Sequence, residues 1–112
     1  MAIELRTGEK LIHEGGANLH RGWEAVGGHL YLTSQRLLFQ SHSFNVQTGN
    51  AEIPLAEVAS LRLCWTKFLG FVPVFPNSLA IHTADGSEHR FVVQARQSWS
   101  DAIRQQLDLS QV

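Results

Sequence analysis

The chain has 112 residues, of which 44% are hydrophobic, and nine Lys and Arg residues stand against ten Asp and Glu residues for a formal net charge of −1. A chain of this size forms one domain that hides roughly two-thirds of its unfolded surface. The balanced charge excludes a global positive field that would collect nucleic acid, so we expect a single domain over residues 1–112 and no nucleic-acid partner.

The N-terminal half of the chain predicts β-strands. Its apolar residues alternate with period two, and turn signals recur about every eight to twelve residues, a pattern typical of a sandwich or barrel. We expect a first strand over residues 17–25, with a bulge at Arg21 and Gly22, that ends at Gly27-Gly28. Residues 29–40 then predict a β-hairpin that turns at Thr33-Ser34-Gln35.

The second half continues this pattern. Residues 51–55 predict a short fourth strand, and Pro54 places it at an edge of the sheet because proline has no N–H to donate. Residues 61–65 predict a fifth strand, and residues 79–83 predict a sixth. Asp85-Gly86 is a strong hairpin signal that leads into a seventh strand containing Phe91 and Val93.

The C-terminal tail changes to helical spacing. One helix face carries Trp99, Ala102, Ile103, Gln106 and Leu107. Ser98 and Asp101 predict a capping box at the start of this helix. The expected fold class is therefore mainly β, a seven-stranded antiparallel sandwich or partly open barrel capped by one C-terminal α-helix, with Trp99 closing the barrel end.

Residues 27–39, GGHLYLTSQRLLF, resemble the signature G-x-L-Y-L-T-x-x-R-L-x-F of GRAM domains of the bacterial single-domain type. Residues 42–61 and 76–93 are similar to the segments that follow in that family, and the resemblance covers the chain from Gly8 to Leu107, the expected core of the domain. It implies a pleckstrin-homology-like (PH-like) superfold and a non-enzymatic module that binds membrane phosphoinositides or protein partners.

The first hairpin departs from the pattern of lipid-binding PH domains, which carry a dense cluster of Lys and Arg there. This chain offers His20, Arg21, His29 and Arg36 in that region. A polyphosphate headgroup requires several charge-assisted donors, and the two arginines of this hairpin are few for that role. For Arg36 two roles stay open: a structural pair with a carboxylate, which we favour, and ligand binding.

An apolar stretch over residues 67–77, KFLGFVPVFPN, is the principal candidate for binding. It is too short to span a bilayer, and its two prolines argue against a helix. Three coverings are open: the domain itself, a protein partner or second copy, and an anionic membrane surface with Arg62 and Lys67 near the headgroups. The candidate ligand- or partner-binding residues are Arg62, Lys67, Phe68, Leu69, Phe71, Val72 and Arg36.

No nucleotide-binding, zinc-protease or hydrolase motif occurs in the chain. We therefore expect no enzyme, no catalytic or metal-binding residues and no cofactor. Cys64, the only cysteine, cannot form an internal disulfide, and a nucleophile built from it with a histidine is a remote alternative. His82 and His89 flank the Asp85-Gly86 turn as the best candidate metal pair, although a solvated cross-strand pair is favoured.

The function predicted from these observations is a non-catalytic binding module that mediates protein–protein interaction or self-association. Peripheral binding of a phosphoinositide or anionic lipid through residues 67–76 is the alternative, and a small hydrolase or metal-binding protein is a distant one. The N-terminal residues MAIELRTGEK contain no apolar signal core, so we expect a cytoplasmic location, with attachment to the membrane surface as the alternative.

Overall fold

The computed structural model describes residues 3–21, 24–41, 50–68 and 72–110. The strands are β1 (Leu11–Arg21), β2 (Glu24–Thr33), β3 (Arg36–Ser41), β4 (Ala51–Pro54), β5 (Val58–Phe68), β6 (Val72–Thr83) and β7 (Glu88–Val93). A short 3-10 helix, η1 (Leu55–Glu57), follows β4, and the C-terminal helix is α2 (Arg96–Ser110). Element order in the described chain thus follows the predicted series of strands and one final helix.

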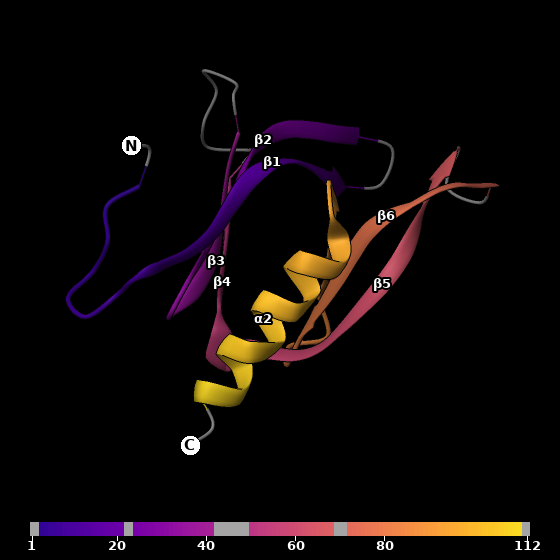
Figure 1. Cartoon of the computed structure of the whole chain (residues 1–112). Helices are drawn as coiled ribbons and strands as arrows, with labels where there is room; N and C mark the ends of the chain where they lie inside the picture. The colour runs from indigo at the N-terminus through magenta and orange to yellow at the C-terminus, as the bar shows by residue number, and fades with distance from the viewer. Residues whose placement is uncertain (1–2, 22–23, 42–49, 69–71, 111–112) are drawn as a thin grey trace.

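The seven described strands form one antiparallel sheet in the order β4-β3-β2-β1-β7-β6-β5. Strands β4 and β5 are its two edges, and the sheet is not closed into a barrel. Figure 1 shows the sheet folded over, with α2 lying across its open side, where the helix contacts η1, β1, β5 and β6. The predicted fold class, a partly open PH-like sheet capped by one helix, is confirmed.

Alternate residues of the strands supply the core. The fully buried apolar side chains face α2 and one another across the folded sheet, as the period-two pattern predicts. They include Leu19, Leu30, Leu32, Leu37, Phe39, Ile53, Leu79, Ile81 and Phe91, and Ile103 of α2 packs against them. Trp99 of α2 is also buried in this core, at 2% exposure.

The predicted first strand is wrong. Strand β1 ends at Arg21 and β2 begins at Glu24, and these two residues pair across the hairpin. The apolar alternation continues in phase through this turn, so periodicity alone cannot separate the two strands. Gly28 lies inside β2 and not at its end. A Cβ atom there would lie 2.2 Å from the Gln40 carbonyl oxygen. Glycine is required for the close approach of β3, not for a turn.

The predicted capping box is wrong as well. Helix α2 begins at Arg96, so Ser98 lies inside its first turn. The Trp99 N–H donates to the Ala95 carbonyl at 3.2 Å, and Asp101 accepts a hydrogen bond from the Gln97 side chain at 3.0 Å. Ala95 has a φ of 53°, which lets the chain leave β7 and enter the helix at once.

Two further predictions are confirmed, the edge position of the fourth strand and the Asp85-Gly86 hairpin. Pro54 is the last residue of edge strand β4. At the β6–β7 hairpin, the Thr83 N–H donates to the Ser87 carbonyl at 3.0 Å, and Gly86 has a φ of 90°. A side chain at that φ is strained, which explains the preference for glycine in the Asp-Gly turn.

Candidate functional site

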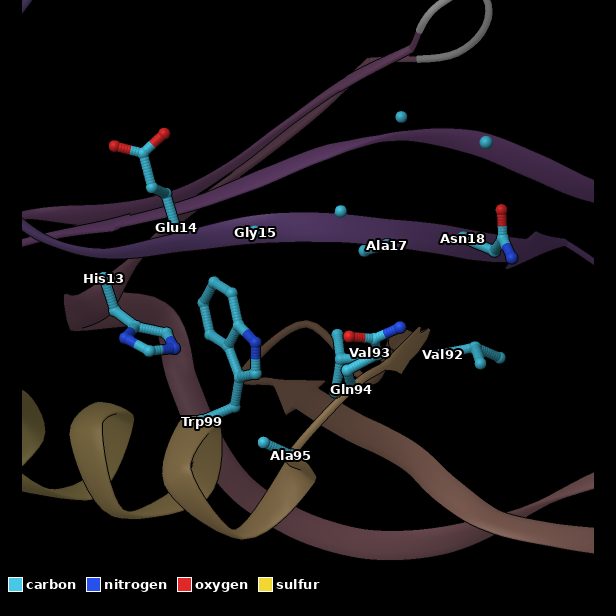
Figure 2. A pocket seen from close by; sticks show the side chains of 13 residues that line it. His13, Glu14, Gly15, Ala17, Asn18, Val92, Val93, Gln94, Ala95 and Trp99 are labelled. Carbon is cyan, nitrogen blue, oxygen red and sulfur yellow. The ribbon is translucent and has the colours of Figure 1, made fainter.

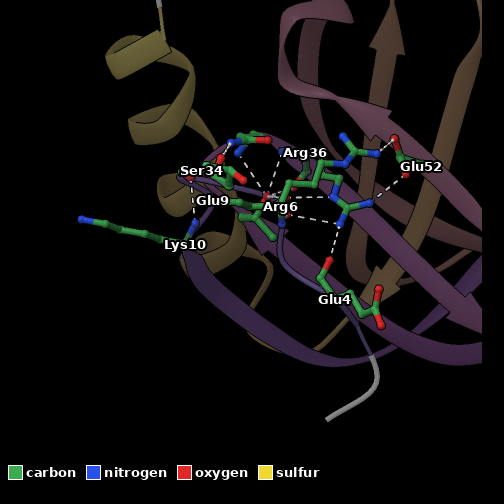
Figure 3. A network of polar contacts seen from close by, with 10 residues as sticks. Glu4, Arg6, Glu9, Lys10, Ser34, Arg36 and Glu52 are labelled. Carbon is green, nitrogen blue, oxygen red and sulfur yellow. Dashed lines mark hydrogen bonds and ion pairs between the residues drawn. The ribbon is translucent and has the colours of Figure 1, made fainter.

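Arg36 lies in a buried network at the start of β3 (Figure 3). Its side chain is 8% exposed, and its Nε and Nη2 atoms donate to the Glu9 carboxylate at 2.8 and 3.2 Å. Its Nη1 atom donates to Glu52 at 2.9 Å, and Nη2 also donates to the Glu4 carbonyl at 3.0 Å. Every guanidinium nitrogen therefore has a partner within the chain, which is the structural role favoured for this arginine.

The same network explains why threonine and arginine stand three residues apart in the signature. The Thr33 hydroxyl donates to Glu9 and accepts the Arg36 backbone N–H at 3.0 Å. Burial of the Glu9 carboxyl group alone raises its pKa, but hydrogen bonds from Arg36, Thr33 and the Arg6 backbone lower it more, so the pKa falls from 4.5 to about 2. Thr33 and Arg36 thus hold the N-terminal segment against the β2–β3 turn.

The other predicted binding residues belong to the β5–β6 hairpin. Backbone pairing joins Thr66 to Phe75, Lys67 to Pro73 and Phe68 to Val72. Leu69 and Phe71 lie outside the described residues, and the side chains of residues 64–77, which include Cys64 and Trp65, are likewise not described. Arg36 belongs to β3, and four strands lie between β3 and β5 in the order of the sheet, so the structure does not pair it with these residues.

The β5–β6 hairpin extends beyond the end of the neighbouring strand β7. Strand β7 pairs with β6 only from Ser78 to His82, whereas β5 follows β6 as far as Val72. Figure 1 shows the end of the β5–β6 hairpin reaching past the rest of the sheet. We call the paired residues 66–68 and 72–75 the ribbon. On its other side β5 is an edge of the sheet, and Arg62, on that strand, is exposed.

A second surface, which the sequence interpretation missed, is a groove of about 740 Å³ between β1, the end of β7 and the start of α2 (Figure 2). Its walls are notable for glycine: Gly15 and Gly16 on β1, and Gly27 and Gly28 on β2. Trp99 lies beneath it, 4.4 Å from the His13 ring in an edge-on arrangement. In the sequence, the two Gly-Gly pairs were the signal that could have pointed to this groove. They indicate a groove only once the register of β1 and β2 is known, because the register places them close together.

The predicted histidine pair does not form. The β6–β7 register places Glu88 opposite His82, and His89 faces Ile81 instead. His82 contacts Glu88 at 2.8 Å and Ser60 at 3.3 Å, in a row that crosses β5, β6 and β7 on an exposed part of the sheet. In the part of the chain that the structure describes, no group of three possible metal ligands occurs.

Comparison with protein-family models matches the GRAM domain model to residues 2–110. The chain belongs to the GRAM domain family. No helix in the described segments of this GRAM domain is long and apolar enough to cross a membrane. The single-domain bacterial type stays a prediction. Comparison with curated proteins finds no match.

Several solved structures share the fold of this GRAM domain. The C-terminal domain of an unknown protein from Leishmania infantum superimposes with a TM-score of 0.71 at 21% identity, over 90% of this chain and 87% of that chain. The N-terminal PH domain of Vps36 superimposes with a TM-score of 0.70 at 22% identity, over 94% of this chain and 83% of that chain. The DH/PH domain of human ARHGEF11, solved with human RhoA, gives 0.70 at 16% identity over 91% of this chain but 30% of that chain.

These likenesses agree with the sheet order and the final helix, and they show the PH-like fold. Together with the family match, they establish a GRAM/PH-like domain, a kind of module known for interaction with proteins or lipids. Fold alone does not select between those two classes of partner.

Proposed function

We propose that this GRAM domain is a non-catalytic binding module that associates with another protein through the ribbon and the connecting residues 69–71, with a second copy of the chain as the simplest partner. The observation that carries the proposal is the length of the β5–β6 hairpin. Its backbone pairing continues to Phe68 and Val72, beyond the end of β7 pairing at Ser78. Isolated two-stranded ribbons are at best marginally stable in water, so a ribbon of this kind gains from contact with another surface.

The composition of the stretch supports the same conclusion. Residues 67–77 contain six large apolar side chains and one charge, that of Lys67. Burying each apolar side chain is worth roughly 1.5 to 3 kcal/mol, so leaving all of them in water forgoes on the order of 10 kcal/mol. That is comparable with the net stability of a typical domain, about 5–15 kcal/mol. Uncharged aromatic patches of this kind are typical of interface cores.

Charge favours a protein partner over a membrane. The cations of β5 are Arg62, which precedes the ribbon, and Lys67, which belongs to it. One apolar wedge with two cations binds anionic lipid only marginally unless several copies act together. The signature arginine, Arg36, is held by carboxylates of its own chain and adds no donor at the ribbon.

The solution mass tests this function. The monomer mass is 12.5 kDa, and we expect light scattering to give a larger, concentration-dependent mass for the natural protein. Phe71→Ser should reduce it to 12.5 kDa, whereas Leu5→Ser, which removes an apolar side chain that is 41% exposed in the segment before β1, should leave it unchanged. A monomer in all three cases would refute self-association.

Sedimentation with liposomes tests the alternative. Vesicles that contain an anionic phospholipid are mixed with the protein at low salt, where surface electrostatics are strongest. We expect the protein to stay in the supernatant at neutral and at mildly acidic pH. Co-sedimentation that Phe71→Ser abolishes, with Leu5→Ser as the control, would replace the protein-binding proposal with membrane attachment.

A further inference from the structure

Strand β1 has a partner on only part of its second edge. Strand β7 pairs with it from His20, opposite Arg90, to Ala17, opposite Val93. The chain then leaves the sheet at Gln94 and Ala95 and enters α2. Over the described residues, no strand lies beside this edge of β1 between His13 and Gly16, although β2 pairs with the opposite edge throughout.

The groove of Figure 2 includes the space beside β1 that β7 leaves, between residues 13–17 and residues 94–99, and it also reaches across β1 to Gly27 and Gly28 of β2. Its volume of about 740 Å³ falls within the range of ligand sites, roughly 300–1,000 Å³. A Cβ atom on Gly16 would meet nothing within 4 Å, and one on Gly15 would meet only Trp99, at 3.7 Å. Glycine at both positions lets another backbone approach β1 closely.

We propose that this groove binds an extended peptide segment of another protein, which adds to β1 as an antiparallel strand in line with β7. Backbone N–H and C=O groups on a strand edge are strong hydrogen-bonding groups that a further strand satisfies. Strand addition of this kind is a general mode of peptide recognition, in which main-chain hydrogen bonds give affinity and alternate side chains give specificity.

The alternation of β1 assigns the chemistry of the peptide. Ala17 and Leu19 are buried, so Gly15 shares their inner face, next to Trp99, and Gly16 and Glu14 share the outer face. The peptide residue opposite Gly15 therefore points toward the indole and should be apolar. The residue opposite Glu14 should be Lys or Arg, because oppositely charged residues directly across two strands attract each other.

Glu14 is the carboxylate among the residues that line the groove, and its side chain is 45% exposed while it contacts His29 at 3.0 Å. A Lys or Arg side chain of the peptide could therefore reach the Glu14 carboxylate at the surface, without displacing any buried side chain. An opposite-charge pair across strands corresponds to about a threefold gain in affinity, and its replacement by a like-charge pair to about a tenfold loss.

The test uses a phage-displayed library of random eight-residue peptides, selected on the natural protein, and synthetic copies of the enriched sequences. We expect a basic residue at a fixed position, shifts of the amide resonances of residues 13–16 on binding, and loss of binding when alternate peptide nitrogens are methylated. An absence of enriched peptides, shifts confined to other parts of the sheet, or no effect of methylation would each overturn the proposal.

Three variants sharpen the test. Glu14→Lys should weaken the basic peptides about tenfold and should select acidic residues at the same position. Glu57→Lys, the same charge change at an exposed residue of η1, should leave peptide affinity unchanged. Phe71→Ser should also leave it unchanged, so failure of the groove and failure of the ribbon give different results.

Discussion

The Nε atom of Arg36 lies 2.8 Å from a carboxylate oxygen of Glu9, and both side chains are buried. The pair joins the start of β3 to the segment that precedes β1, two parts of the chain that share no strand pairing. A buried ion pair is weak evidence of net stability, but the loss of one member leaves the other charged and unpaired. Arg36 therefore has a structural role, because it ties the N-terminal segment to the start of β3.

Arg36→Met should lower the free energy of unfolding by about 3 kcal/mol, because Glu9 would lose its main charge partner in the interior. Urea denaturation at neutral pH measures this change. Arg6→Met is the matched control: Arg6 contacts Glu52 at 3.0 Å, but its side chain is 54% exposed, so its loss should cost no more than about 1 kcal/mol. Equal effects of the two substitutions would contradict the assigned network.

Stability should depend on pH through Glu9. Its pKa is about 2 in the folded chain against 4.5 for the ordinary side chain, so the folded state binds the proton less readily than the unfolded state. The stabilisation is therefore complete above pH 4.5 and is lost as the pH falls toward 2.

Denaturation of Glu9→Gln across the same pH range checks this, because the variant has no carboxyl group to titrate at residue 9. Its stability should fall less steeply with acid than that of the natural protein. The pKa of Glu52 is also lowered, by hydrogen bonds from Arg6 and Arg36 that outweigh the effect of burial, so some slope should remain. Glu57→Gln should retain the natural slope, and parallel curves for all three proteins would refute the role of Glu9.

Two glycines of the first hairpin should respond oppositely to alanine. Gly28→Ala places a Cβ atom 2.2 Å from the Gln40 carbonyl oxygen and 2.6 Å from the Phe39 ring, so strand β3 must move, at a cost of about 1–3 kcal/mol. Gly16→Ala meets open space and should be neutral or stabilise by about 0.5 kcal/mol. Thermal unfolding of both variants measures the difference, and a destabilised Gly16→Ala would show that the groove is more closely filled.

Arg104 covers part of the β5 edge. Its Nη2 atom donates to the Leu61 carbonyl at 3.1 Å, and its Nε atom donates to Ser100 at 3.0 Å. Arg104→Met should lower the free energy of unfolding by about 1.5 kcal/mol. It should also expose the Leu61 carbonyl on β5, to which another strand can pair. The variant should therefore show a larger average mass at equal concentration. Gln105→Met, at an exposed position of the same helix, should show neither change.

Much of the fold could be predicted because the strands keep a strict alternation and the turns use distinctive residues, such as Asp85-Gly86. The β1–β2 turn was missed because the apolar alternation of residues 17–25 continues through it. The partner of Arg36 was not predictable either, since Glu9 lies 27 positions earlier and no local pattern connects the two. The groove depends on the point where β7 leaves β1, which is a property of register and not of any single segment.

The measurement that tests the binding function most directly is a concentration series of amide spectra of the natural protein. If the ribbon is the contact between copies, the resonances of residues 58–68 and 72–83 should move as the concentration rises, and those of β3 and β4 should not. Phe71→Ser should abolish the movement, and Leu5→Ser should preserve it. Spectra that do not change with concentration, or changes that fall outside β5 and β6, would contradict self-association through the ribbon.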